Sequence, residues 1–412
     1  MKILIIYRYY WPDIAPYGKI LKYMTERWVK DRNDVTVFTG QPTYNDINAT
    51  KRPRSECHNG VKTLRAVLFP ERKNWNLLRI INFALFLLQA VFHVLLKKNY
   101  QLIVVNSFPP VFMGTTARWI SKIWKIPYIY HCQDLHPESA RIGGGIKNRW
   151  LFETLKRIDT RNCIKAWRVV TLSKDMNKTL ALRGLPPNNI RIINNFILDS
   201  NDGQKTLPAQ MSGKTKDDFF VLFAGNMGHF QGLERIIEAC RILSEYKQMR
   251  FFFMGEGSAK KNLMRQSGDL LNKTIFFIPY QPTAVAFRAN EVSDFAIVAL
   301  KPDVYRVAFP SKTMMYLAAG CPILALIEKE SELAREILER DLGLVCSQTD
   351  APQLADTIYG AWKGREIWRR KRKNISIVAR QLFGKEMILK QWSDLIRELS
   401  TDTRSQEAVS VS

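Results

Sequence analysis

The chain has few cysteines and shows no pattern among them. Its six cysteines are scattered along 412 residues, with no Cys-x-x-Cys pair and no neighbouring histidine cluster. This arrangement argues against a zinc site and against a disulfide framework, and it fits a reducing cytoplasm. The first apolar run, residues 3–7, is too short for a signal peptide, so we expect none. No short internal repeat is visible either.

Acidic residues are scarce in the first half of the chain. Residues 1–200 hold 13 Asp and Glu against 32 Lys and Arg, a net charge of +19, whereas residues 201–412 hold 25 against 30, a net +5. The basic half is therefore expected to face an anionic partner. A nucleic acid, an anionic membrane surface and a diphosphate-bearing substrate each fit this charge. Because no RNA-binding signature or basic–aromatic repeat accompanies it, we expect no nucleic acid.

One apolar run, residues 77–96, approaches the length of a membrane span and has basic pairs on both sides. Arg79, Asn82, Gln89 and His93 interrupt it, and the last three share one helical face. The run is therefore a crossover helix packed on a sheet, a helix in a membrane interface, or a transmembrane span. The polar stripe favours the first two, which a packed helix with a lipid-facing apolar flank would combine.

Short aliphatic runs alternate with helical stretches along the whole chain. Most of these runs are apolar on both faces, which predicts an α/β fold with open, doubly wound parallel sheets. The predicted strands cover residues 2–7, 35–39, 102–105, 128–130, 169–172, 219–223, 250–254, 274–278, 295–299 and 323–326.

A polar segment with Gly, Pro and Ser but no periodicity divides these strands into two arrays of similar size. We therefore predict two Rossmann-like domains facing a cleft, followed by a helix that crosses back to the first domain. The predicted boundaries are 1–197 for the first domain, 198–217 for the linker, 218–380 for the second domain, 381–400 for the C-terminal helix and 401–412 for a disordered tail.

Ligands of such sheets bind in the loops that follow the carboxyl ends of strands. In the second half, Gly225, Gly228 and Gly232 lie between a predicted strand and a helix, and Gly255-Glu256-Gly257 follows the next strand. Glycines at these places let a phosphate approach the backbone, although each loop alone is also compatible with a plain βα turn.

A third loop carries Pro310-Ser311-Lys312 before a helix predicted over residues 313–319, which Gly320 and Pro322 end. Ser311 is a good N-cap, and Lys312 adds a positive charge beside the positive end of the helix dipole. An ordinary βαβ turn with a solvated lysine is the alternative. Together the three loops indicate a cleft for a nucleotide diphosphate.

In the first half, Gly18-Lys19 opens a helix after the first strand, and residues 131–139 follow the strand at 128–130. The segment 131–139 brings two acids, two histidines and a glutamine together, and Pro137 prevents a helix from running through them. It is either a site for sugar hydroxyls or acid–base chemistry, or a helix cap formed by Asp134 or Ser139. His131 by itself is expected to be a strand-end residue.

These motifs, in this order, resemble glycosyltransferase family 4, the retaining transferases of GT-B fold. Within it, the chain is most similar to bacterial transferases of the colanic-acid, fucosamine and O-antigen type. The resemblance extends to about residue 395 and rests on residues 1–7, Gly18-Lys19, residues 133–139, Gly225-Asn226-Met227-Gly228, Gln231-Gly232, Gly255-Glu256-Gly257, Pro310-Ser311-Lys312, residues 317–322 and residues 331–334.

The resemblance implies transfer of a sugar, with retention, from a nucleotide-diphosphate sugar to a polyprenyl-diphosphate-linked saccharide in bacterial surface polysaccharide synthesis. The enzyme would act in the cytoplasm, bound peripherally to the anionic surface of the inner membrane. No metal or other cofactor is expected, because such enzymes meet the leaving diphosphate with protein dipoles and cations and the chain has no Asp-x-Asp signature.

The resemblance also assigns roles to residues. Lys312 would stabilise charge on the departing diphosphate, and Asp134 would bind or orient sugar hydroxyls. The donor would be bound by Gly18, Gly225, Asn226, Gly228, Gln231, Glu256, Ser311, Lys312 and Glu332, and the acceptor by Gln133, His136 and Glu138.

The chain departs from the family at several of these places. Asn226 and Gln231 stand where an Arg and a Lys are frequent, and Val307 and Met315 replace the two glutamates of an E-x7-E pattern. Gln133 replaces the histidine of a His-Asp pair. These departures motivate a second hypothesis, a catalytically silent GT-B scaffold that binds a partner or a membrane. A GT-B enzyme that performs no transfer, such as a sugar-nucleotide epimerase, is a third.

Overall fold

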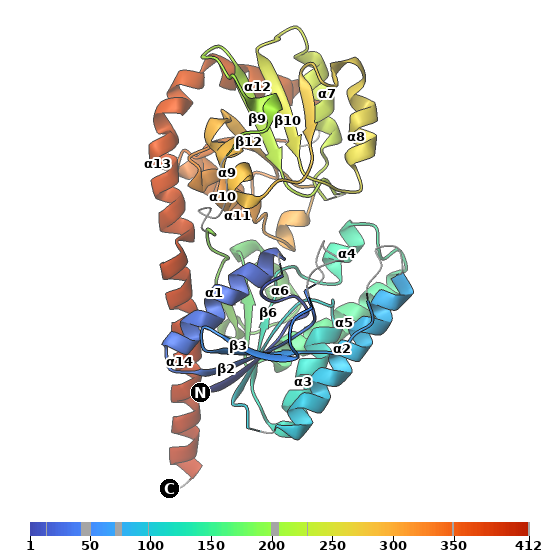
Figure 1. The fold of residues 1–412 in the computed structure, drawn as a ribbon, viewed down its shortest axis with the longest axis vertical. Coiled ribbons are helices and arrows are strands. Elements are labelled where there is room, and N and C mark those ends of the chain that lie inside the picture. The colour runs from blue at the N-terminus through green and yellow to red at the C-terminus, as the bar shows by residue number, and fades with distance from the viewer. Residues whose placement is uncertain are drawn as a thin grey trace. The chain divides into compact units, whose positions relative to one another are not determined.

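The computed structural model describes residues 1–13, 15–42, 51–70, 76–97, 99–198, 206–228, 230–347 and 350–410. The chain divides into two compact units (Figure 1). The first unit comprises Met1–Asn195 together with Glu386–Ser412, and the second comprises Phe196–Lys385. The predicted crossing of the C-terminal helix back to the first domain is therefore confirmed. The first boundary falls at residue 195 rather than 197, and residues 199–205 of the predicted linker lie outside the described residues.

The first unit is built on a sheet with strand order β3-β4-β2-β1-β5-β6-β7-β8, parallel throughout except between β3 and β4. Its central strands, β1 and β5, are runs of buried aliphatic residues, as expected for a parallel sheet covered on both faces. The strands are β1 (Lys2–Ile6), β2 (Asp34–Thr39), β3 (Ser55–His58), β4 (Val61–Arg65), β5 (Leu102–Asn106), β6 (Tyr128–His131), β7 (Arg168–Thr171) and β8 (Ile190–Ile192).

Helices connect these strands and pack on the sheet. Two of them begin with a side-chain cap: Asn148 accepts from Leu151 N at 3.0 Å, and Ser173 from Met176 N at 3.2 Å. The helices of the first unit are α1 (Pro16–Lys30), α2 (Asn76–Leu96), α3 (Phe112–Trp124), α4 (Glu138–Ile142), α5 (Arg149–Lys165), α6 (Lys174–Leu182) and α14 (Lys385–Ser410).

The second unit has a fully parallel sheet of strand order β11-β10-β9-β12-β13-β14. Numbered from β9, this is the order 3-2-1-4-5-6 of a Rossmann sheet, as predicted. Its strands are β9 (Phe219–Ala224), β10 (Met249–Met254), β11 (Ile275–Ile278), β12 (Phe295–Ala299), β13 (Ile323–Leu326) and β14 (Gly343–Cys346), and its helices are α7 (Glu234–Ile242), α8 (Lys260–Ser267), α9 (Thr283–Val292), α10 (Lys312–Ala318), α11 (Glu332–Glu339), α12 (Ala351–Lys363) and α13 (Arg365–Phe383).

Helix α14 is anchored in the first unit by aromatic and ionic contacts. The Trp392 ring lies 6.0 Å from that of Trp28 and 4.8 Å from that of His131. Glu398 bonds to Arg168 and, at 2.9 Å, to Arg191. The helix continues to Ser410, so the tail predicted as disordered from residue 401 is helical up to there. No Gly or Pro interrupts residues 385–410, which explains the continuation.

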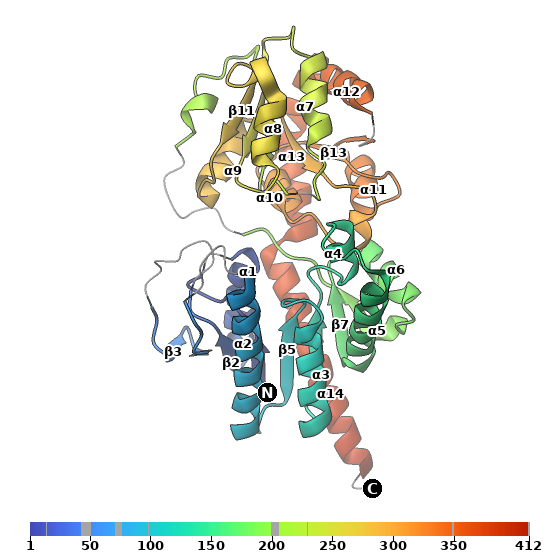
Figure 2. The same cartoon turned by 90° about the vertical axis from the view of Figure 1, so that its right-hand side faces the viewer.

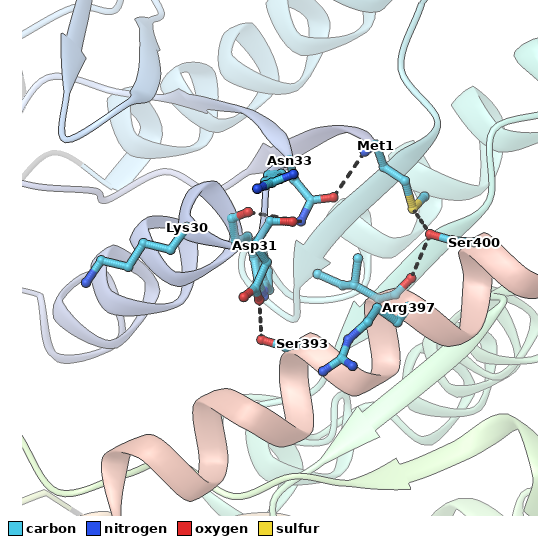
Figure 3. Close-up of a pocket in the computed structure, with 10 residues that line it drawn as sticks. Met1, Lys30, Asp31, Asn33, Ser393, Arg397 and Ser400 are labelled. Atoms are coloured by element: carbon cyan, nitrogen blue, oxygen red, sulfur yellow. Dashed lines mark hydrogen bonds between the residues drawn. The ribbon is translucent and has the colours of Figure 1, made fainter.

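A crevice of about 440 Å³ separates the end of α1 from α14 (Figure 3). At its edge Ser393 Oγ donates to Asp31 at 2.5 Å, and the Met1 amine donates to Asn33 Oδ1 at 3.1 Å. Met1 precedes β1 and Asn33 precedes β2, so the crevice lies at the amino ends of the strands. Ligands of parallel sheets bind at the opposite edge, and we therefore do not place the functional site here.

Candidate functional site

In the second unit the chain order of the strands reverses between the neighbours β9 and β12. At such a reversal the loops after the two strands diverge and leave a crevice, where open α/β sheets bind ligands. The loops here cover residues 225–233 and 300–311. Lys301 N donates to Phe230 O at 2.7 Å, which ties the two loops together. The loop with Gly225, Gly228 and Gly232 thus follows β9, and Lys312 follows the loop after β12. Both therefore lie at the reversal of strand order.

The two glycine loops, after β9 and β10, stack backbone on backbone. A Cβ on Gly255 would lie 2.2 Å from Gly225 O, and one on Gly257 would lie 2.2 Å from Met227 O. Met227 N donates to Glu256 O at 2.8 Å across the same contact. Both glycines also have positive φ, +136° at Gly255 and +157° at Gly257. Only glycine fits these places, and part of the glycine pattern therefore serves the packing of the loops.

The amine of Lys312 is enclosed where these loops meet. Its Nζ lies 3.7 Å from the centroid of the Phe223 ring. A Cβ on Gly225 would approach that Nζ to 3.0 Å, so this glycine leaves room for the amine. Although the side chain as a whole is only half-buried, Nζ is shielded from water and has no hydrogen-bond partner in the described part of the chain. This desolvation lowers the pKa of Lys312 to about 7.

Tyr316, one turn after Lys312 on α10, fixes the lysine in this position. Its hydroxyl donates to Ala224 O and accepts from Ala224 N, both at 2.8 Å. Because residues four apart share a helical face, this clamp at the end of β9 holds Lys312 over Phe223 and Gly225. Tyr316 was not among the predicted site residues, although its spacing of four from Lys312 places both on one helical face.

The structure gives the local geometry of Ser311, Gly228, Asn226 and Gln231 among the predicted donor residues. Ser311 occupies the N-cap position of α10, but its backbone is helical and its side chain makes no capping bond. Gly228 lies in the loop between β9 and α7, which begins at Glu234. Gly228 N donates to Gln231 Oε1 at 3.0 Å, and a Cβ there would approach Asn226 Nδ2 to 2.9 Å. Gly228, Asn226 and Gln231 thus form one tight turn.

The two predicted donor-site glutamates lie on neighbouring loops. Glu256 is exposed, and its carboxylate pairs with Lys260 Nζ at 2.7 Å. Glu332 lies in the first turn of α11, after β13. Ser331 caps that helix by accepting from Ala334 N at 3.2 Å. The predicted donor residues of the second unit therefore all follow the carboxyl ends of β9, β10, β12 or β13.

In the first unit the loop after β6 begins with a buried hydrogen-bond chain. Gln133 Nε2 lies 2.8 Å from His131 Nε2, and Asn195 Nδ2 donates to Gln133 Oε1 at 2.8 Å. Since the amide donates, His131 Nε2 accepts, and Nδ1–H then donates to the Tyr17 hydroxyl at 2.9 Å. Burial lowers the pKa of His131 to about 3, so the ring is neutral. The side-chain nitrogen and oxygen of Gln133 are therefore both hydrogen-bonded within the protein.

Glu138 and His136 are also engaged. Glu138 forms an ion pair with Arg183, which also bonds to Asp159 at 2.8 Å and donates to His136 O at 2.9 Å. His136 Nδ1 lies 2.8 Å from Ser139 Oγ. Burial, together with the nearby Arg183 guanidinium, lowers the pKa of His136 to about 4. This cluster holds the loop in place, and neither Asp134 nor Ser139 caps α4.

Asp134 is the acid of this loop whose carboxylate is not held by the described neighbouring side chains. The side chain is exposed, its backbone N donates to Ser107 Oγ at 3.4 Å, and no residue of the described chain bonds to its carboxylate. Gly18 lies inside α1, where a Cβ would approach Tyr9 O to 2.8 Å, so it permits close packing of α1 on the preceding loop.

Among the described residues no group of three or more His, Cys, Asp or Glu could hold a metal ion. All six thiols are free.

Two protein families match the chain in succession. Residues 17–195 match the glycosyl transferase 4-like domain, and residues 205–381 match glycosyl transferases group 1. The chain is 22% identical to the putative colanic acid biosynthesis glycosyl transferase WcaI of Escherichia coli K12, over 96% of this chain and 100% of WcaI. It is 24% identical to the probable glycosyltransferase WbjE of Pseudomonas aeruginosa, over 64% of this chain and 65% of WbjE.

Solved structures agree on the fold. Sucrose-phosphate synthase from Thermosynechococcus elongatus matches with a TM-score of 0.76 at 16% identity, over 98% of this chain and 100% of that one. HepE from Anabaena, in complex with UDP, matches with a TM-score of 0.69 at 16% identity, over 97% of this chain and 100% of that one. Similarity at this low identity shows the shared two-domain fold.

Proposed function

The chain belongs to the GT-B glycosyltransferases of family 4, of the colanic-acid and O-antigen type, and we propose that it moves a sugar from a nucleotide-diphosphate sugar onto a lipid-linked saccharide with retention of configuration. It is a glycosyltransferase of polysaccharide or lipopolysaccharide biosynthesis. The donor class, the acceptor class and the stereochemistry are the parts that we propose. The enclosed amine of Lys312 carries the proposal for the donor.

A buried amine without a hydrogen-bond partner is unfavourable unless a ligand supplies one. Lys312 Nζ lies at the reversal of a Rossmann sheet, between Phe223 and the glycine loop at Gly225. A diphosphate bound there would provide the missing acceptor oxygens and the opposite charge. Strongly perturbed groups in such places are frequent at functional sites. HepE, whose structure is similar, binds UDP and UDP-glucose, which makes uridine nucleotides the first ligands to test here.

In the proposed reaction the bond between the sugar C1 and the diphosphate oxygen breaks, and a bond from C1 to an acceptor hydroxyl oxygen forms. The proton of that hydroxyl goes to the departing diphosphate oxygen. Negative charge develops on the departing nucleoside diphosphate. The protonated Lys312 would stabilise that charge, a contribution typically worth about 2.7–4 kcal/mol of barrier, or roughly a hundred- to a thousandfold in kcat. No metal is part of this proposal, and EDTA should leave turnover unchanged.

Asp134 is the residue that we propose for the sugar hydroxyls. Its carboxylate is exposed at the end of β6 and bonds to no described residue, whereas Gln133, His136 and Glu138 are held by other side chains. A carboxylate accepts hydrogen bonds from two hydroxyls at once, which suits a sugar. The acceptor contacts predicted for the other three residues would require their present bonds to rearrange.

The lipid-linked nature of the acceptor is inferred from charge and hydropathy. The first 200 residues carry a net +19, and α2 is apolar enough to contact lipid. A polyprenyl diphosphate combines an anionic head with an apolar tail, which matches both features. We accordingly place the enzyme at the cytoplasmic face of the inner membrane as a peripheral protein.

A thermal-shift panel of UDP, GDP, ADP and dTDP tests the donor proposal. A nucleotide at a hundred times its dissociation constant stabilises the folded state by roughly 2.7 kcal/mol. We expect a shift with one nucleotide for the wild type and for the surface control Lys261→Met, and no shift for Lys312→Met. Absence of any shift in folded wild-type protein would instead favour the silent scaffold. Product analysis with and without acceptor separates transfer from epimerisation, and the anomeric configuration of the product tests retention.

A further inference from the structure

The outward side of α2 is apolar along its whole length. Among the described residues, α2 is the one helix long and apolar enough to cross a membrane by length and composition. Its 21 residues extend about 30 Å at 1.5 Å per residue. The outward residues are 40–72% exposed and recur mostly at spacings of three and four: Leu77, Ile80, Ile81, Leu88, Phe92 and Leu95. Such a continuous exposed stripe is unusual on a soluble surface.

The inward side of α2 is fixed to the first unit by its polar residues. Asn82 accepts from Phe69 N and donates to Phe69 O at 3.0 and 2.9 Å. Gln89 forms the same pair with Val67 at 2.9 and 2.8 Å. His93 Nε2 lies 2.7 Å from the Tyr100 hydroxyl. The polar stripe therefore bonds to neighbouring backbone through Asn82 and Gln89 and to the Tyr100 side chain through His93. Helix α2 is thus a packed crossover helix, the first of the three alternatives from the sequence.

Helix α3 extends this apolar surface. It packs beside α2 (Figure 2). Its outward residues Phe112, Trp119 and Ile123 are 56–61% exposed and lie on one helical face. We call the outward residues of both helices the α2–α3 face. Trp119 belongs to a residue type that favours the membrane–water interface.

The charge around the α2–α3 face is predominantly positive. Residues 66–127, which contain both helices, include eight Lys and Arg and a single acid, Glu71. Lys97, Lys122 and Lys125 are exposed at the carboxyl-terminal ends of the two helices. An apolar stripe bordered by cations complements an anionic lipid surface, where each basic residue adds roughly 1 kcal/mol of attraction. A second copy of this chain would instead bring like charges together.

We propose that the α2–α3 face inserts into the acyl-chain boundary of an anionic bilayer, with both helices lying flat in the interface. This deepens the proposed function and rests on it, because it assigns the surface at which the lipid-linked acceptor meets the enzyme. Aromatic rings connect α2 to the edge of the sheet where the strands have their carboxyl ends. The Phe83 ring lies 5.2 Å from the Phe108 ring, which lies 6.0 Å from the ring of Tyr9 in the loop after β1. An acceptor tail on α2 would thus lead toward the loops that follow β1 and β5.

A fluorophore placed on the face tests the insertion. Cys57 is the exposed one of the six cysteines, so Cys57→Ser removes the reactive thiol and Leu88→Cys supplies a single new one. We expect an NBD label at residue 88 of the full chain to shift to the blue on vesicles with phosphatidylglycerol, and to be quenched by lipids with doxyl groups on the acyl chain. The matched control Leu182→Cys, 85% exposed on α6 of the same unit, should show neither change.

A negative charge introduced on the α2–α3 face provides a second test, in which the partition into vesicles is measured. Leu88→Glu should lower the partition into the same vesicles by roughly ten- to a hundredfold, because a buried leucine contributes that factor, whereas Leu182→Glu should not. Equal labelling responses at residues 88 and 182, or unchanged partition of Leu88→Glu, would overturn the proposal. So would concentration-dependent dimerisation that Leu88→Glu abolishes. Nucleotide shifts in solution are independent of lipid, so a failure of insertion and a failure of the donor proposal are distinguishable.

Discussion

Donor binding to Lys312 should take up a proton. The amine of Lys312 has a pKa of about 7 in the free protein, because Nζ is desolvated beside Phe223 and has no hydrogen-bond partner among the described residues. A bound diphosphate places negative charge next to that amine and raises its pKa. Above pH 7, binding therefore requires a proton that the free enzyme does not carry.

The size of the effect follows from the pKa. With a pKa of about 7, roughly nine in ten Lys312 side chains are charged at pH 6 and roughly one in ten at pH 8. The dissociation constant of the nucleotide should thus be nearly flat below pH 7. It should rise by up to roughly tenfold per pH unit above 7, until the pKa of the complex is reached. The second ionisation of a terminal phosphate lies near 6, so the range from pH 7 to 9 isolates the lysine.

Isothermal titration calorimetry at pH 8, in two buffers of different ionisation enthalpy, measures the proton directly. We expect an uptake of roughly 0.9 proton per bound nucleotide for the wild type and for Lys261→Met. Lys312→Arg keeps the charge at every pH, so its binding should show no uptake and a flat pH dependence. Lys312→Met should bind weakly and take up no proton. A wild-type uptake near zero at pH 8, with an affinity constant from pH 7 to 9, would refute the assignment of Lys312.

Three further predictions concern stability and turnover. Lys312→Met should raise the stability of the free protein by up to about 5 kcal/mol at and below pH 7, since a lysine whose pKa falls from 10.5 to about 7 on folding is destabilising when charged. That gain should shrink toward zero as the pH rises to 10.5, and urea unfolding of both proteins from pH 6 to 10 measures it. Gly255→Ala, whose Cβ would lie 2.2 Å from Gly225 O, should lower the melting temperature, whereas Gly360→Ala in the open middle of α12 should raise it slightly or leave it unchanged. Asp134→Asn should lower kcat with little change in nucleotide affinity, and equal losses in both, measured by steady-state kinetics and calorimetry, would contradict its role toward the sugar.

The parallel strands were predictable from the sequence because they are buried on both faces. Runs such as those of β1, β5 and β9 contain no alternation, and their positions agree with the structure within one or two residues. The hairpin of β3 and β4 was missed, although Asn59-Gly60 marks its turn with φ of +50° and +79°. Its strands are short and partly exposed, so they contain no continuous apolar run. The edge strands β8 and β14 were missed for the same reason.

The candidate site was predictable in position but not in its bonds. The loops after β9, β10 and β12 do carry the predicted glycines and Lys312. Sequence spacing could not show that Arg183, 45 residues after Glu138, would engage that carboxylate. Nor could it show that Tyr316 clamps Ala224. Such contacts depend on which strand ends become neighbours, and this is decided by the strand order of the folded sheet.

Lys312 is the position where the local rules of folding and the proposed chemistry disagree. A methionine would fill the space beside Phe223 without a desolvated amine. The folded protein nevertheless encloses a lysine there and fixes it through Tyr316. A neutral amine can lie against the aromatic ring while the site is empty, and it gains its charge when a diphosphate arrives. The positive charge is then greatest when anionic substrate is bound, which is when the proposed transfer requires it.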